Sequence, residues 1–578
     1  MKYLMEFLKQ NQKRLWIILF AALLEVFGTL LVPFFVKEII DTGIVQKDLS
    51  AIFRIGLQML AAAAFTALLS LWGSYLCADL AALAGKDLRK KIFDKTQMLS
   101  IKDFNHFGTA SMITRATGDI TVIQQSVILF SQMILPTPLI AIAAIIMTAL
   151  IYPSLIAIPL VAIVIFFIVI FFLFRKAKPI SESIQKKVDS VNWVVRESII
   201  GIRVIRAFDN SEYEQKRTDN AFSDYANHMI RLNRIFAAFN PLVWAIMGIA
   251  MVAVVWFGGY FVLHGQIQVG SIAAVSEYTI LMLVFLMMSA MVLVMLPRAL
   301  SCLKRIQEVL DTVPEILDAE DCKVTNTENP QKIVFDNVSF SYQGAEKPVL
   351  ENLNFVCGQG KTTAIIGGTG SGKSTIAALM LRLYDVAGGQ IRLEGEDIRN
   401  LTQHQLRQRI SYVPQKAFLF SGTIADNLRM GSNDATKDEL RHAAEIAQAA
   451  PFISTLDLEY GSPVAQGGTN FSGGQKQRLS IARALVKKAP VYLLDDCFSA
   501  LDYKTDAALR SALRQGMKDA AVVIIAQRIS TIMDADQIIV LDAGRIAGVG
   551  THEELLKSCD VYKEIADSQL TEKERSRV

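Results

Sequence analysis

Six long apolar stretches within the first 300 residues constrain the fold of this 578-residue chain more than any other feature. A helix needs about 20 apolar residues to cross the hydrocarbon core of a bilayer, and each stretch approaches or exceeds that length. We therefore expect an all-α transmembrane domain over residues 1–310. Its six spans are predicted at about 15–36, 55–83, 127–151, 155–174, 242–263 and 272–296.

The loops between these stretches are of two kinds. Two are short and contain no Lys or Arg, near Pro153 and at 264–270, whereas 85–125 and 175–240 are long and rich in both residues. Because Lys and Arg are enriched in cytoplasmic loops, we place the long segments and both termini in the cytoplasm. The expected location is a plasma (inner) membrane.

The long cytoplasmic segments have a helical pattern. At about 1.5 Å per residue, they would continue the spanning helices roughly 20–30 Å below the membrane. They turn around in short polar pieces near 107–111 and 209–213. At these turns a cytoplasmic motor could act on the membrane domain.

Two features of the membrane part leave alternatives open. Residues 1–12 place their apolar side chains on one helical face, which is typical of a helix in the membrane interface and also of an ordinary cytosolic helix. Glu25, Asp79 and Glu277 lie within predicted spans, where a charge is unfavourable unless it faces water or a partner. Glu25 either faces an aqueous cavity and attracts cationic substrates or is paired or neutral. For Asp79 and Glu277 we favour a partner or a neutral carboxyl group.

Composition separates the two halves of the chain. The hydrophobic fraction is 52% and mean hydropathy is +0.35, but the excess of apolar residues ends near residue 300. The net charge of +4 does not indicate a nucleic-acid partner. The six cysteines are far apart and lack metal-binding spacing, which indicates buried or idle thiols. A polar linker at 311–332 leads into a domain at 333–578.

A phosphate-binding loop follows a predicted β-strand at 362–366 and precedes a predicted helix at 374–383. Glycines let successive N–H groups point at phosphate oxygens, and the helix N-terminus favours their negative charge. The lysine would reach the β- and γ-phosphates of ATP, and the serine hydroxyl would bind Mg²⁺. The alternative is a Gly/Ser-rich turn before a helix. The loop consists of Gly367, Gly368, Thr369, Gly370, Ser371, Gly372, Lys373 and Ser374.

Four further motifs surround this loop in the sequence. Tyr342 precedes it and could stack on adenine, and Gln415 follows a strand and could touch Mg²⁺. Each is weak evidence alone. Asp495 ends an apolar strand, as a carboxylate that holds Mg²⁺ or its water would. A helix opens after Ser472, which can cap it, and its N-terminus is an anion site. This signature is Ser472, Gly473, Gly474 and Gln475.

In this order and spacing, the phosphate loop, the signature and the strand ending in Asp495 resemble the ATPase domain of ABC transporters. With the six spans, the whole chain resembles an ABC exporter half-transporter: a transmembrane domain fused to an α/β ATPase domain with a P-loop. The resemblance implies that two ATPase domains close head-to-tail on two ATP molecules, so that residues 472–475 serve the partner's ATP. It adds Thr375 and Asp502 to the nucleotide-binding residues and identifies the two turnarounds as coupling helices.

Two positions depart from the family pattern at the same ATP. Asp496 stands where the family has a glutamate as general base, and about 1 Å of misplacement can lower the rate on the order of 10²-fold. Gln527 stands where the family has a histidine, and glutamine carries neither imidazolium charge nor a shuttled proton. We expect a site that binds ATP but hydrolyses it poorly. Residues 464–468 lack the usual charges, which suggests an altered contact with the membrane part, and Phe471 replaces the usual leucine conservatively.

These departures favour one half of a heterodimeric exporter of hydrophobic or amphipathic compounds. The partner chain would supply intact Glu and His, and residues 472–475 would complete its active site. The first alternative is a homodimeric lipid or drug exporter in which Asp496 still acts as base. The second is an ATP-gated channel or regulatory subunit. An importer is disfavoured, because importers of the family usually carry the membrane and ATPase parts on separate chains.

Overall fold

The computed structural model describes residues 2–318, 329–499 and 501–569. These residues form two compact units. One lies within Met1–Gln97 and Phe107–Thr312, and the other lies within Met98–His106 and Val313–Val578.

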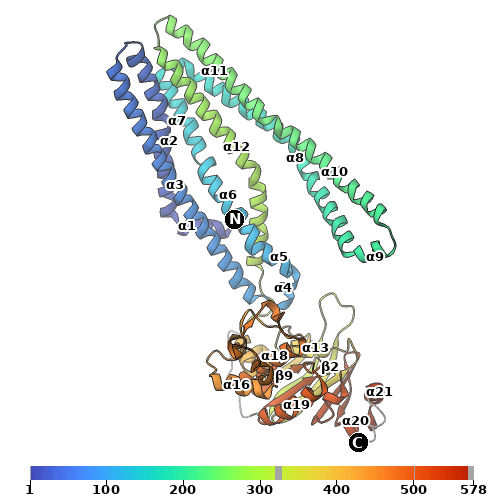
Figure 1. The fold of residues 1–578 in the computed structure, drawn as a ribbon. Coiled ribbons are helices and arrows are strands. Elements are labelled where there is room, and N and C mark those ends of the chain that lie inside the picture. Colours follow the sequence, from blue (N-terminus) through green and yellow to red (C-terminus); the bar gives the residue numbers. More distant parts are fainter. Residues whose placement is uncertain (1, 319–328, 500, 570–578) are drawn as a thin grey trace. The chain divides into compact units, whose positions relative to one another are not determined.

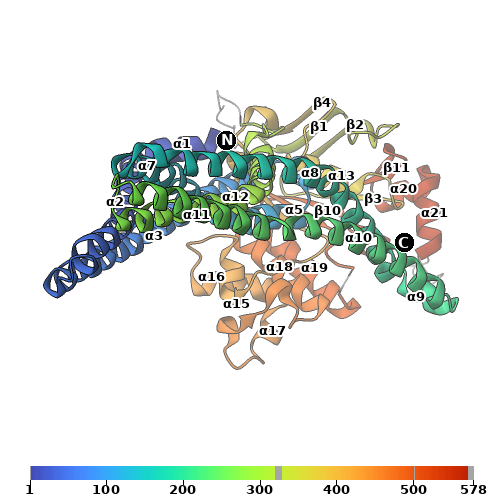
Figure 2. The same cartoon turned by 90° about the horizontal axis from the view of Figure 1, so that it is seen from above.

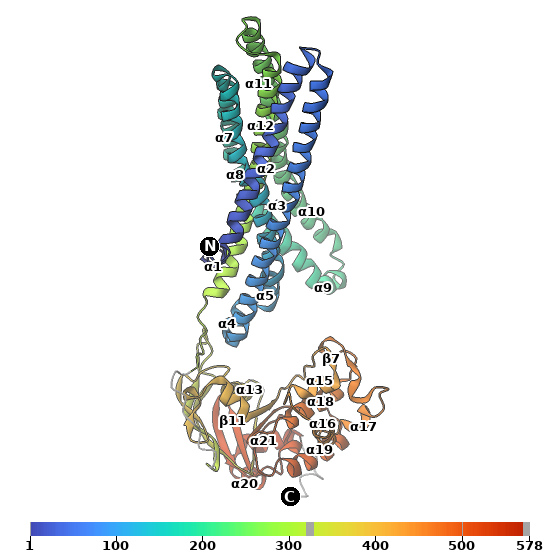
Figure 3. The same cartoon turned by 90° about the vertical axis from the view of Figure 1, so that its left-hand side faces the viewer.

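The first unit consists of long helices, which Figure 1 shows in blue to light green. Helix α12 lies at its centre and contacts α2, α6, α7 and α11. In Figures 2 and 3, α8 and α10 run side by side to the short helix α9. The helices are α1 (Lys2–Gln10), α2 (Gln12–Glu38), α3 (Leu49–Met98), α4 (Ile101–Phe107, mostly in the second unit), α5 (Thr109–Thr114), α6 (Ile120–Leu129), α7 (Pro136–Ile151), α8 (Ala157–Ile200), α9 (Ile202–Ala207), α10 (Ser211–Ala237), α11 (Phe239–Leu263) and α12 (Val269–Asp311).

Six helical segments among the described residues are long and apolar enough to cross a membrane. Their outer surface is also apolar: Phe53, Leu57 and Leu71 on α3 are 78%, 69% and 68% exposed. An apolar surface of this extent is unfavourable in water and favourable in lipid. The segments are Gln12–Ile44, Leu49–Met98, Thr109–Ile151, Pro153–Ile200, Ser211–Leu263 and Val269–Asp311.

The turns between the long helices begin earlier in the chain than 107–111 and 209–213. The first contains α4 and a bend at Gly108, whose φ of 76° suits a residue without a Cβ atom. The second contains α9 and a bend at Asp209, whose φ of 50° is left-handed. The short helices α4 and α9 follow the ends of α3 and α8 and come just before the polar residues that marked the turns.

The acidic residues of the predicted spans lie in different surroundings. Asp79 on α3 forms an ion pair with Arg14 on α2, with 2.5 Å between Oδ2 and Nη1, as expected for a paired carboxylate. Glu25 and Glu277 are half-buried. Phe7 on α1 is buried in a cluster with residues of α2 and α3, so part of the apolar face of α1 packs against the helices rather than lipid.

The second unit contains a six-stranded sheet in the order β12-β11-β3-β10-β9-β6 and a four-stranded sheet in the order β2-β1-β4-β5. Strands β6, β9, β10, β3 and β11 are parallel neighbours. The strands are β1 (Gln331–Phe340), β2 (Leu350–Gly358), β3 (Thr362–Gly367), β4 (Gly388–Leu393), β5 (Glu396–Asp397), β6 (Ile410–Val413), β7 (Gly422–Thr423), β8 (Pro463–Val464), β9 (Val491–Asp495), β10 (Ala521–Ile525), β11 (Gln537–Asp542) and β12 (Arg545–Gly550).

Both faces of the six-stranded sheet are buried, which explains why its strands are continuous apolar runs. Alternate residues of β10 enter two separate hydrophobic clusters. Figure 3 shows α15 to α18 as a lobe beside the strands. The helices are α13 (Lys373–Met380), α14 (Gln403–Arg409), α15 (Ile424–Arg429), α16 (Lys437–Ile446), α17 (Ala450–Ile453), α18 (Gly473–Val486), α19 (Tyr503–Gly516), α20 (His552–Ser558) and α21 (Asp560–Gln569).

The described cysteines are free and buried, as the sequence predicted; Cys322 lies outside the described residues. The expected linker at 311–332 overlaps the last residue of α12 and the first two residues of β1, and its residues 319–328 are outside the described part of the chain. The predicted architecture of a helical transmembrane part followed by an α/β domain is confirmed.

A buried carboxylate in the first unit provides a stability test. Asp119 is 4% exposed and accepts hydrogen bonds from Arg305 on α12 at 2.8 and 2.5 Å. The Arg305→Gln variant would leave Asp119 buried with a weaker, uncharged partner. We expect it to lower the free energy of unfolding by roughly 2–3 kcal/mol, measured from thermal melting in detergent. The control is Lys304→Gln, an exposed neighbour; equal melting of the two variants would contradict the prediction.

Candidate functional site

Parallel strand pairing brings distant residues of the second unit to one edge of the six-stranded sheet. In the observed register, Ile525 of β10 lies opposite Ile365 of β3 and Asp495 of β9. Val413 of β6 lies opposite Leu494 of β9. The carboxyl ends of these strands therefore form one rim, and ligands of open α/β sheets bind at such rims.

The phosphate loop occupies the carboxyl end of β3. Gly370 and Gly372 have φ values of 84° and 99°, and a Cβ atom on Gly367 would lie 2.2 Å from the Leu541 carbonyl oxygen. Only glycine fits such positions without strain. Lys373 Nζ donates hydrogen bonds to the carbonyls of Gly367 and Gly368 at 2.8 and 2.7 Å. The ammonium group is therefore held inside the loop, at the start of α13.

Charges around the loop act on one another. Burial lowers the pKa of Lys373, and the nearby carboxylates of Asp496 and Asp495 oppose this shift. Burial, and then the charge of Asp496, raises the pKa of Asp495 to about 6. Tyr412 lies 3.5 Å from Asp495 through its hydroxyl group. Two adjacent, largely buried carboxylates favour binding of a further cation, because their own repulsion raises their free energy in the charged form.

Asp496 is the centre of a small hydrogen-bond network. Its Oδ2 atom accepts from Gln527 Nε2 at 2.9 Å and from Gln415 Nε2 at 3.3 Å. Its backbone N–H donates to Ile525 at 2.8 Å, and its φ is 45°, an uncommon conformation for a residue other than glycine. Burial raises the pKa of Asp496, and the Gln415 hydrogen bond opposes this. The structure therefore joins the two positions that depart from the family pattern.

Tyr342 and Thr375 lie together near the start of α13. The Tyr342 hydroxyl is 3.1 Å from Thr375 Oγ1, and its ring packs edge-on against Phe340 and Tyr384. The ring is 39% exposed, so one part of it remains available to a ligand. The contact of this ring with adenine stays a prediction.

The signature lies at the start of α18, in another part of the second unit. Ser472 caps this helix: its side chain accepts from the Gln475 N–H at 3.3 Å, and its own N–H donates to Gln475 Oε1 at 2.9 Å. Ser472 and Gly473 are exposed. Helix α18 packs against α15, α16 and β6. Asp502 similarly caps α19 by accepting from the Thr505 N–H at 2.9 Å.

Two contributors to the site have no sequence motif. Arg528 acts electrostatically on Asp496 and lowers its pKa, against the effect of burial. Gln569, at the end of α21, forms hydrogen bonds with the backbone on both sides of Arg528. Neither position belongs to a motif that sequence reasoning uses, and only the fold brings them to the site.

Two protein-family models match this chain. The model of the ABC transporter transmembrane region covers residues 15–287, and the ABC transporter model covers residues 350–499. An uncharacterised ABC transporter ATP-binding protein of Mycobacterium tuberculosis is 36% identical over 551 residues, which are 95% of this chain and 94% of that protein. The chain belongs to the ABC transporter family.

Other relatives of this transporter have functional names. An ATP-dependent lipid A-core flippase of Syntrophus aciditrophicus is 30% identical and covers 86% of the chain and 83% of the flippase. A multidrug efflux ATP-binding/permease protein of Mycobacterium tuberculosis is 31% identical over 94% of the chain but only 45% of that protein. The solved structure of a bacterial Atm1-family ABC exporter with ATP bound has a TM-score of 0.82 at 27% identity, over 97% of this chain and 99% of that one.

These matches confirm the predicted half-transporter, in which a membrane domain is fused to an ATPase domain. The protein is a multi-pass membrane protein with an ATP-binding ABC domain, and its general activity is ATP-driven export.

The lysine of the phosphate loop allows a direct test of ATP binding. We expect Lys373→Ala to weaken ATP binding roughly 10- to 100-fold, because charge-assisted hydrogen bonds to the phosphates are lost. Binding of a fluorescent ATP analogue to the purified transporter measures this. Lys361→Ala is the control, since Lys361 is exposed at the opposite end of β3. Equal affinities for the two variants would contradict the assignment.

Proposed function

We propose that this ABC transporter exports lipids or drug-like amphipathic compounds as an assembly of two half-transporters. The observation that carries the proposal is similarity along nearly the whole chain to proteins named as a lipid A-core flippase and an Atm1-family exporter. The multidrug efflux relative is about twice as long as the matched region, which leaves room in it for a second half. A plasma (inner) membrane with the ATPase domain in the cytoplasm is part of this proposal.

In the proposed site, ATP lies against the loop at 367–374 with its adenine on Tyr342. Ser374, Asp495 and Gln415 would hold Mg²⁺, which prefers oxygen ligands and usually takes only one or two protein carboxylates beside phosphates and water. The adjacent carboxylates of Asp495 and Asp496 fit this cation, because burial raises the pKa of both. The bound cation would compensate the phosphate charge.

The substrate would enter through the membrane domain. The proposed compounds are apolar or amphipathic because the spanning helices supply mostly apolar side chains. Glu25 is half-buried in α2, and a carboxylate at that depth favours cationic substrates if it lines the pathway.

Two copies of this chain form the first version of the assembly, which the flippase and exporter relatives favour. Residues 472–475 of each copy would then complete the ATP site of the other, and Asp496 would act as general base. The Gln527 amide at 2.9 Å would hold the Asp496 carboxylate in place.

A heterodimer with a different half-transporter is the second version, and the Asp496–Gln527 pair favours it. Asp496 is shorter than glutamate, and two amide groups already donate hydrogen bonds to its Oδ2 atom, which an attacking water would also have to approach. A partner chain with Glu and His at these positions would supply an efficient site that Ser472 helps to complete. This chain's own site would then chiefly bind ATP and hold the dimer closed.

Two substitutions distinguish these versions by ATPase activity in nanodiscs. In a homodimer, Lys373→Ala and Ser472→Arg should each abolish activity of the purified chain, because each damages both sites. In a heterodimer, Ser472→Arg should abolish the activity of the complex, whereas Lys373→Ala should leave most of it. The wild-type chain alone should then hydrolyse ATP slowly. The proposed function would be contradicted if neither the homodimer nor the heterodimer exported amphipathic compounds and if such compounds did not stimulate the ATPase activity.

The double substitution Asp496→Glu with Gln527→His tests whether this site limits hydrolysis. We expect the basal ATPase rate to rise about tenfold or more, because the carboxylate gains reach and the imidazole can carry a proton. Gln527→Asn alone is the matched control, which keeps an amide but shortens it. An unchanged rate for the double variant would mean that this site never limited turnover.

A further inference from the structure

The loop after β10 carries Gln527 to the ATP site, and its backbone is bound by a side chain from the C-terminal helix. Gln569 Nε2 donates to the Gln527 carbonyl at 2.8 Å, and Gln569 Oε1 accepts from the Ile529 N–H at 2.9 Å. One amide group thus satisfies two backbone groups that flank Arg528. Both bonds have good lengths for N–H···O hydrogen bonds.

This double contact restricts the direction of the Gln527 side chain. Fixing the carbonyl of one residue and the N–H of the second residue after it limits rotation of the peptide units between them. Gln527 is exposed and carries the amide that donates to Asp496 at 2.9 Å. Without the brace from Gln569, the loop would have more conformations, and fewer of them would keep the amide beside Asp496.

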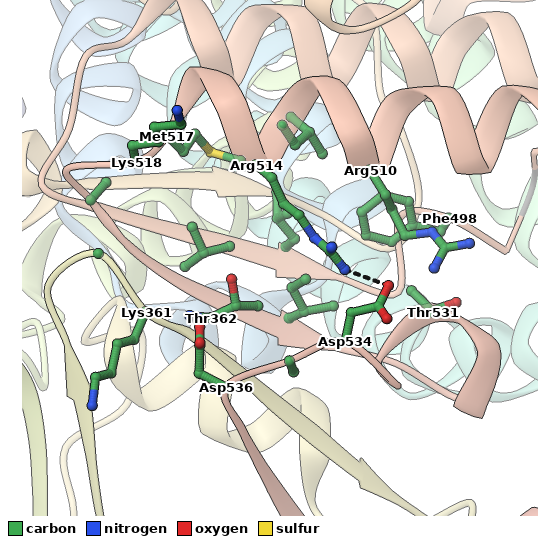
Figure 4. Close-up of a pocket in the computed structure, with 17 residues that line it drawn as sticks. Lys361, Thr362, Phe498, Arg510, Arg514, Met517, Lys518, Thr531, Asp534 and Asp536 are labelled. Carbon is green, nitrogen blue, oxygen red and sulfur yellow. Dashed lines mark hydrogen bonds and ion pairs between the residues drawn. The ribbon is translucent and has the colours of Figure 1, made fainter. Parts of the chain in front are cut away.

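The two helices that hold this loop contact different parts of it. Arg510 of α19 donates to the Ser530 carbonyl at 2.7 Å. Its side chain also lines a cavity of about 290 Å³, and Figure 4 shows it among the lining residues. That contact falls three residues beyond Gln527. The Gln569 contact falls on Gln527 itself, so it is the more direct constraint on the site.

Gln569 is well placed for this role and poorly placed for a purely structural one. Its side chain is exposed, so its removal takes little apolar surface from the core. Helix α21 is anchored independently by the buried side chains of Tyr562 and Ala566, and the Tyr562 hydroxyl bonds to His552 Nδ1 at 2.7 Å. The helix should therefore stay folded when Gln569 is changed.

We propose that Gln569 is a positioning residue for ATP hydrolysis, which holds the backbone at Gln527 so that the Gln527 amide faces Asp496. The proposal rests on the version of the proposed function in which this chain's own site hydrolyses ATP, with Gln527 on the γ-phosphate side. It makes the C-terminal helix part of the nucleotide site, although no sequence motif of that site lies there.

Hydrogen–deuterium exchange of the full-length transporter tests the brace without any need for turnover. In Gln569→Ala, the Ile529 N–H should exchange roughly tenfold faster, because its acceptor is lost. Gln569→Glu keeps the acceptor but loses the donor, so exchange at Ile529 should stay near the wild-type rate. Exchange in β3 and β9 should not change. Equal exchange at Ile529 in the wild type and Gln569→Ala would overturn the brace.

A double-mutant cycle on ATPase activity tests the action through Gln527. In the transporter assembled from this chain alone, we expect Gln569→Ala to lower kcat roughly three- to tenfold with an unchanged KM for ATP, and to have no further effect in a Gln527→Ala background. Gln569→Glu should lower kcat as well, since the bond to the Gln527 carbonyl is lost. Glu564→Gln, exposed on the same helix, should leave kcat unchanged.

The outcomes separate this proposal from the proposed function. Equal loss of kcat from Gln569→Ala in both backgrounds, or no loss in the wild-type background, would overturn the positioning role. Absence of ATP hydrolysis from the assembled wild-type transporter would instead contradict the proposed function, and the exchange experiment would still decide whether the brace exists.

Discussion

Parallel pairing of buried strands is the constraint on which the nucleotide site of this transporter depends. Each strand contributes one element at its carboxyl end: the phosphate loop after β3, Gln415 after β6, the acidic pair after β9 and Gln527 after β10. The register holds because both faces of the sheet are buried. A slip by one residue would exchange the two apolar faces and move every rim residue.

The buried charges at this rim are suited to a nucleotide and a cation together. Lys373 is held by carbonyl groups and has a lowered pKa, whereas Asp495 has a raised pKa near its acidic neighbour. Each group is unfavourable in its charged form while it is buried without a counter-ion. Phosphate oxygens beside Lys373 and a divalent cation beside Asp495 would relieve both.

Much of this architecture could be predicted from the sequence. The apolar stretches predicted six spanning helices, because length and composition alone decide whether a helix can cross a bilayer. The phosphate loop and the signature predicted the ATPase domain, since their chemistry lies in consecutive residues. The turns were less predictable: α4 and α9 begin before the polar residues that marked them, because a helical pattern does not show where packing ends a helix. The identity of the partner subunit could not be predicted either, because it depends on a second chain.

By itself, the sequence determined which chemical groups are available: the lysine and glycines of the loop, and aspartate and glutamine at positions 496 and 527. These follow from local residue identity. Only the tertiary structure decided how the groups meet. The 2.9 Å contact of Gln527 with Asp496, and the brace from Gln569, join residues 31 and 42 positions apart. Such contacts depend on strand register and helix packing, which short sequence motifs do not encode.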